Sequence, residues 1–232
     1  MQDYSKYQQF ATDVLGVKFN DISMLVMAFT HRSYVNEHKK IVSEHNERLE
    51  FLGDAVLELI STEYLYNRFK DPEGALTTWR SALVRTESIG AAAGRLGFEP
   101  FLRLSKGEKR GTDRARAQIL ANSYEAVLGA IYLDSGYDEA KKFVTHSLLN
   151  TFDQILEEGS WMDPKSYLQE LAQSKEGLTP IYKVLDEAGP DHDKAYTVGV
   201  FINGQIRGRG SGPSKQAGQV AAAKAALEQY KL

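Results

Sequence analysis

Three acidic residues in the first half of the chain share one face of an expected helix. Glu47, Glu50 and Asp54 fall within about 60° of one another when an α-helix turns by about 100° per residue. The other faces of this segment carry leucine, valine, isoleucine and phenylalanine, so we expect the helix to be buried. A buried carboxylate without a partner costs several kcal/mol. These acids therefore need either basic partners or a cation.

A second apolar segment, residues 119–133, carries oxygen-bearing side chains at a matching spacing. Asn122 and Glu125 stand at positions i and i+3, on one helix face. Oxygen groups that converge from two packed helices suit Mg²⁺, which prefers near-octahedral oxygen ligands and keeps several waters for substrate phosphates. The alternative is that the acids form structural ion pairs, with Arg48 or Arg32 as the basic partners. Spacing alone leaves both interpretations open.

The elements that must position these residues are helices. Apolar residues recur at three- and four-residue spacing, and polar or Gly/Pro-containing breaks separate the recurrences. The pattern predicts an all-α domain over residues 1–156. Its expected helices lie near residues 4–15, 22–30, 45–69, 76–96, 115–134 and 137–156.

The pattern changes after a short polar stretch, residues 157–162, which we interpret as a linker. Asp163 and Pro164 are typical of a helix start. Strands are expected over residues 180–187, 195–202 and 205–210, with Asn203-Gly204 as a two-residue hairpin turn between the last two. Ser214 is the expected cap of a final helix that runs to residue 231. The chain is thus expected to be multidomain, with an α+β module of α-β-β-β-α order over residues 163–232.

Composition limits the function classes less sharply. The net charge of −3 argues against a uniformly basic nucleic-acid-binding surface, but not against a local basic patch. The absence of cysteine excludes disulfides, thiolate metal sites and a cysteine nucleophile. We find neither a long apolar run nor a secretory signal, so we expect a cytoplasmic protein without membrane association.

Four segments, in this order, resemble the ribonuclease III family. They are AFTHRSY at residues 28–34, NERLEFLGDAVL at 46–57, LVRTE at 83–87 and EAVLGAIYLD at 125–134. The second segment is highly specific, and the tail resembles a double-stranded-RNA-binding domain. The resemblance covers essentially the whole chain. It implies an all-α, homodimeric endonuclease domain that cuts both strands of double-stranded RNA during RNA processing, including that of rRNA and mRNA.

The resemblance also implies the roles of individual residues. Glu50 and Glu125 would bind Mg²⁺, with Mn²⁺ as the expected substitute, and Glu125 and Asp54 would be catalytic, Asp54 lying near the attacking water and the scissile phosphate. Glu47 would lie at the edge of the cleft, where it would contact RNA or support the site. The implied chemistry is metal-assisted phosphodiester hydrolysis, which leaves a 5′-phosphate, a 3′-hydroxyl and a short 3′ overhang.

One departure from the family pattern bears on activity. The family's second acidic pair usually reads Asp-x-x-Glu, whereas this chain has Asn122 before Glu125. An amide oxygen can still ligate a cation, so Asn122 stays a candidate metal ligand, but it brings no negative charge. Three explanations stay open: a natural variant that remains active, an engineered change, and a protein that binds double-stranded RNA with little or no cleavage.

The tail would read the shape of an RNA duplex rather than its sequence. By resemblance, Gln169 and Glu170 would contact 2′-hydroxyls in one minor groove, and His192 would enter the next. Lys215 would contact phosphates at the start of the last helix. Gln216 stands where the family usually has a second lysine, which predicts fewer phosphate contacts and weaker binding by the tail.

Overall fold

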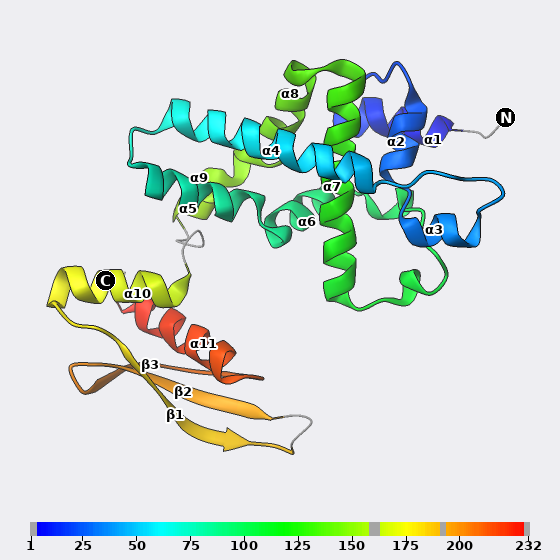
Figure 1. Cartoon of the computed structure of the whole chain (residues 1–232). Helices are drawn as coiled ribbons and strands as arrows, with labels where there is room; N and C mark the ends of the chain where they lie inside the picture. Colours follow the sequence, from blue (N-terminus) through cyan, green and yellow to red (C-terminus); the bar gives the residue numbers. More distant parts are fainter. Residues whose placement is uncertain (1–3, 158–162, 191–193, 230–232) are drawn as a thin grey trace. The chain divides into compact units, whose positions relative to one another are not determined.

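The computed structural model describes residues 4–157, 163–190 and 194–229. The chain divides into two compact units, residues 1–158 and 159–232. The first is helical, and the second combines helices with a small sheet (Figure 1). Among the described helices, none has both the length and the apolar character needed to cross a lipid bilayer.

The first unit follows the predicted helical pattern with three differences. The predicted helix over residues 76–96 is two helices, because Arg85 takes an extended backbone conformation between them. The helix predicted over residues 137–156 breaks at Leu148, and α3 was not predicted. The helices are α1 (Ser5–Phe10), α2 (Ile22–Ala28), α3 (Arg32–Glu37), α4 (Glu47–Arg68), α5 (Glu73–Val84), α6 (Thr86–Arg95), α7 (Asp113–Ser135), α8 (Tyr137–Ser147) and α9 (Phe152–Glu157), with a π-helical turn at Ala11–Leu15 and 3₁₀ turns at Glu99–Phe101, Glu108–Arg110 and Leu149–Thr151.

The core of the first unit is built around α4 and α7, which cross each other (Figure 1). Leu57 and Ile60 of α4 and Leu128 and Ile131 of α7 are fully buried. The expectation that α4 is buried on all its apolar faces is wrong. Phe51 is 82% exposed in the single chain, so one apolar face of α4 points to solvent.

The second unit confirms the predicted α-β-β-β-α order. It consists of α10 (Pro164–Glu176), β1 (Ile181–Ala188), β2 (Ala195–Ile202), β3 (Gln205–Gly212) and α11 (Lys215–Glu228), and the strands form an antiparallel sheet in the order β1-β2-β3. Asn203 and Gly204 both have positive φ angles, 52° and 73°, as a type I′ hairpin turn requires. Val198, Val200 and Ile202 of β2 are buried, in a core with residues of α10 and α11.

Candidate functional site

A close helix crossing brings the predicted acids of α4 and α7 together. A Cβ atom placed on Gly53 would lie 1.8 Å from the carbonyl oxygen of Glu125, and one placed on Gly129 would lie 2.2 Å from the carbonyl oxygen of Leu49. The two backbones can approach this closely only because both positions are glycine. Asp54 lies one residue after Gly53 on α4, and Glu50 lies three residues before it. Both acids are therefore held beside the turn of α7 that carries Asn122 and Glu125.

Glu125 has the most perturbed acidity of these residues. Its half-buried position raises the pKa of its carboxyl to about 7, and the nearby negative charges of Asp54 and Glu50 add to the increase. Each of these effects disfavours the charged carboxylate. Within the described ranges, no basic side chain forms an ion pair with Glu50, Asp54 or Glu125. The negative charge of these acids is therefore not balanced by a basic side chain within the described part of the chain.

Glu50 responds to the same surroundings. Burial is the largest cause that raises the pKa of Glu50, and the negative charge of Glu47 is the second. A hydrogen bond from Asn122 lowers this pKa, and the negative charge of Asp54 makes a smaller contribution that raises it. Asn122 in turn accepts a hydrogen bond from Gln118, whose Nε2 lies 2.7 Å from the Asn122 Oδ1. The acids of α4 are thus coupled to both polar residues that the sequence analysis singled out on α7.

Glu47 differs from the other acids because it has basic neighbours. Its Oε1 lies 3.5 Å from Nη1 of Arg32, and its Oε2 lies 3.8 Å from Nδ1 of His45. The ion-pair interpretation therefore describes Glu47, with Arg32 as the partner, and does not extend to Glu50, Asp54 or Glu125. Glu47 is exposed at the start of α4, on the same face as the other acids.

These residues suit a hard divalent cation by their donor chemistry. Among the described residues, no three His, Cys, Asp or Glu side chains are already drawn together as a finished metal centre. However, the half-buried carboxylates of Glu50 and Glu125 form no ion pair with a described basic side chain, and the exposed carboxylate of Asp54 and the amide of Asn122 adjoin them. Oxygen donors of this kind fit Mg²⁺ or Mn²⁺, and the set contains no soft ligand.

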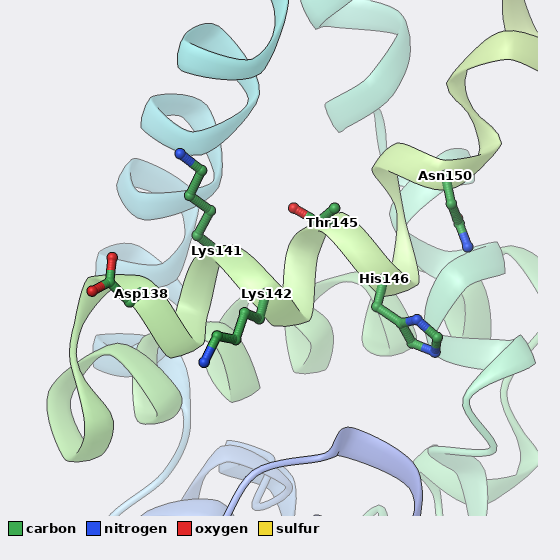
Figure 2. A pocket seen from close by; sticks show the side chains of 6 residues that line it. All are labelled: Asp138, Lys141, Lys142, Thr145, His146 and Asn150. Atoms are coloured by element: carbon green, nitrogen blue, oxygen red, sulfur yellow. The ribbon is translucent and has the colours of Figure 1, made fainter.

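A separate groove of about 690 Å³ lies along α8 and does not belong to this site. Figure 2 shows the side chains that line it: Asp138, Lys141, Lys142, Thr145, His146 and Asn150. Both lysines are already paired, Lys141 with Glu63 at 2.9 Å and Lys142 with Glu139 at 2.6 Å. None of the acids at the helix crossing lines this groove, so the volume of the groove does not make it the candidate active site.

In the second unit, the predicted contact residues lie at the surface. Gln169 and Glu170 are exposed on α10, and Lys215 is exposed at the first position of α11. The Lys215 ammonium lies 3.3 Å from a carboxylate oxygen of Glu187 and 5.6 Å from the ring centre of Tyr196. His192 lies outside the described residues.

A polar groove of about 440 Å³ adds one residue that the sequence analysis missed. Lys165 lines it together with Gln169 and Gln216. The Lys165 ammonium donates to Oε1 of Gln219 at 2.6 Å and lies 5.1 Å from the centre of the Tyr182 ring. Lys165 precedes Gln169 by four residues on the same helix face, and this spacing was the signal available in the sequence.

The comparisons with known proteins agree over both units. Residues 21–152 match the family described as Ribonuclease-III-like, and residues 164–230 match the double-stranded RNA binding motif. The chain is 42% identical over 229 residues to Ribonuclease 3 of Streptococcus gordonii, with 96% of each chain covered. It is 43% identical to Ribonuclease 3 of Enterococcus faecalis, covering 92% of this chain and 93% of that one.

A solved structure agrees with the first unit. It is the nuclease domain of ribonuclease III from Campylobacter jejuni, described for the flexibility of a region involved in dimer formation. The TM-score is 0.57 at 36% identity, and the match covers 62% of this chain and 98% of the other.

Proposed function

Because the chain belongs to the ribonuclease III family, it is an endoribonuclease of double-stranded RNA, and we propose that Glu50, Asp54 and Glu125 form its catalytic centre. The observation that carries this proposal is the uncompensated carboxylate cluster at the crossing of α4 and α7, in which the pKa of Glu125 is raised to about 7. A structural ion-pair network would contain basic side chains, and this cluster depends on a cation instead.

We propose that Glu50 and Glu125, with the amide oxygen of Asn122, hold a magnesium ion. When bound, Mg²⁺ would offset the charge of the acids and polarise the phosphodiester. Asp54 is the exposed acid of the cluster, so its carboxylate can orient the attacking water and accept its proton. The water oxygen bonds to phosphorus as the bond to the 3′-oxygen breaks, which leaves a 3′-hydroxyl and a 5′-phosphate. Glu47, paired with Arg32, lies at the edge and would contact RNA.

Cleavage of a long RNA duplex in Mg²⁺ by this chain and by Asn122→Asp tests the catalytic proposal. We expect both proteins to cut, and Asn122→Asp to cut about tenfold faster, because the added carboxylate strengthens cation binding by roughly 1.4 kcal/mol. Equal rates would contradict the idea that the amide weakens the site. Absence of cutting by both proteins would overturn the catalytic proposal and leave an RNA-binding protein as the function.

We propose that the RNA duplex is held by Gln169, Glu170 and Lys215, and we add Lys165 to this set. Lys165 lines the same groove as Gln169, and its ammonium is held by a neutral amide rather than by a carboxylate. A phosphate can therefore approach it without displacing an ion pair. His192 remains a prediction of the sequence, outside the described residues.

Replacing Lys165 by glutamine is expected to weaken duplex binding and to reduce its salt dependence. Loss of one phosphate contact lowers the slope of log K against log salt by about 0.7 to 0.9. The measurement is duplex binding by the full chain in Ca²⁺ at several salt concentrations. Lys183→Gln is the matched control, because Lys183 packs over Phe201 and does not line the groove. Equal slopes for the two variants would remove Lys165 from the RNA-binding set.

We propose that the endonuclease unit forms a homodimer through the exposed apolar face of α4. Phe51, Leu59 and Tyr66 are 82%, 58% and 69% exposed in the single chain and share one side of the helix. A patch of this kind on a single chain is typical of a protein interface. The related nuclease domain from Campylobacter jejuni is described as forming dimers, which supports a second copy of this chain as the occupant.

Light scattering after size exclusion measures this association directly. The unmodified chain is expected to have the mass of a dimer, and Phe51→Glu that of a monomer, because a charge cannot be buried at the interface without a partner. Ile41→Glu is the control, since Ile41 is 69% exposed in the loop before α4. A dimeric Phe51→Glu protein would place the interface elsewhere.

A further inference from the structure

Gln118 holds the amide of Asn122 from the solvent side of the proposed cation site. The two residues are one turn apart on α7, with Gln118 exposed and Asn122 half-buried. Gln118 donates its Nε2 hydrogen to the Oδ1 atom of Asn122 at 2.7 Å. The Asn122 side chain also lies close enough to Glu50 to lower the pKa of its carboxyl. Asn122 is therefore fixed between an outer amide and an inner carboxylate.

This arrangement determines which end of the Asn122 amide faces Glu50. Because the oxygen accepts from Gln118, the NH₂ group is the end of the amide that is left to face the Glu50 carboxylate. That polarity suits an ionised acid without a metal. It does not suit a cation shared with Glu50, since an NH₂ group has no lone pair to offer and carries positive partial charge.

An amide at position 118 permits the opposite arrangement without the loss of a hydrogen bond. If both amides turn over, Asn122 donates its NH₂ to the oxygen of Gln118 and turns its own oxygen towards Glu50 and the cation. Glutamine can both donate and accept, so the bond between the two residues is kept with reversed polarity. An aspartate at position 122 would not need such a turn, because either of its oxygens can ligate.

We propose that Gln118 is a positioning residue that lets Asn122 serve as a neutral cation ligand in place of a carboxylate. The inference rests on the proposed function, because it assumes a divalent cation at Glu50 and Glu125. It predicts that Gln118 matters to cation binding when residue 122 is asparagine and matters little when it is aspartate.

A double-mutant comparison tests this dependence on residue 122. Mn²⁺ is titrated calorimetrically into the metal-free full chain, without RNA, for the unmodified protein, Gln118→Met, Asn122→Asp and the double variant, with thermal unfolding as a check of folding. We expect Gln118→Met to weaken Mn²⁺ binding about tenfold beside Asn122, and less than about twofold in the Asn122→Asp background. Gln9→Met, at an exposed glutamine of α1, is the matched control and should leave binding unchanged.

The outcomes separate the inference from the proposed function. An equal loss in both backgrounds, or no loss in either, would show that Gln118 and Asn122 form only a surface pair, and would overturn the inference. Absence of Mn²⁺ binding by both the unmodified chain and Asn122→Asp would overturn the cation site itself, and the inference with it.

Discussion

Replacing Glu125 by alanine is expected to lower cleavage of duplex RNA by at least about a thousandfold, which corresponds to roughly 4 kcal/mol in the barrier. Glu125 is the α7 carboxylate that faces Asp54 and Glu50, and its raised pKa shows that the chain offers it no compensating charge. Without it, two acids and an amide remain, and they would bind a divalent cation too weakly for catalysis. The measurement is single-turnover cleavage of a uniform duplex in Mg²⁺.

The same variant is expected to bind the duplex normally in Ca²⁺, because the proposed contacts of the second unit are unchanged. Glu139→Ala is a matched control and should keep full cleavage, since among the described residues Glu139 forms an ion pair with Lys142 of the same helix, α8, and with no residue of the helix crossing. If Glu125→Ala also lost duplex binding, the separation of cleavage and binding between the two units would be wrong.

Replacing Gly53 by alanine is expected to destabilise the first unit by at least about 3 kcal/mol. The added Cβ would lie 1.8 Å from the backbone carbonyl oxygen of Glu125, and a backbone atom cannot move aside as a flexible side chain can. The crossing of α4 and α7 would have to open, which would also separate the acids. Urea unfolding of the metal-free protein measures the change in stability.

Gly94→Ala is the matched control for this substitution. Gly94 also lies within a helix, α6, but a Cβ there would meet no atom within 4 Å. Alanine is the better helix former, so we expect this variant to be stabilised by up to about 1 kcal/mol. A Gly53→Ala protein as stable as Gly94→Ala would contradict the close crossing of the two helices.

Local signals in the sequence were sufficient for the order and the helix caps of the second unit, but not for the register shifts in its sheet. Asp163 accepts hydrogen bonds from the backbone of Lys165 and Ser166, as the predicted N-cap should. Ser214 caps α11 in the same way. The Asn203-Gly204 turn pairs Ile202 with Gln205 and Phe201 with Ile206, before an irregularity at Val200 shifts the register of β2 and β3. The two caps and the turn depend on residues close together in the chain, so their types alone predict them.

Features that depend on tertiary contacts could not be predicted in the same way. Arg85 separates α5 from α6 although it is neither glycine nor proline, so no breaker marks the position. The three α4 acids look equivalent by spacing, yet only Glu47 has Arg32 within reach, because α3 brings that arginine to the start of α4. The exposure of Phe51 could not be predicted from the periodicity either, because buried helix faces and protein interfaces have the same apolar composition.

The residues of the proposed site could be selected from the sequence, but their electrostatics could not be predicted. Glu50, Asp54, Asn122 and Glu125 could be selected from their positions on two apolar segments. Their mutual distance is set by Gly53 and Gly129, which let the helix backbones touch. The hydrogen bond from Gln118 to Asn122 adds a neutral amide to the cluster, and no pattern in the sequence distinguishes Gln118 from its polar neighbours.

Calorimetric titration of Mn²⁺ into the metal-free chain tests the central claim most directly when it is done at pH 6 and pH 8. We expect binding that is tighter at pH 8, with protons released near pH 7, because Glu125 must lose the proton that its raised pKa retains below about 7. Glu125→Gln should bind at least about a hundredfold more weakly at pH 8 and show little pH dependence. Equal binding by the two proteins, or no pH dependence in the unmodified chain, would contradict a cation site at the crossing of α4 and α7.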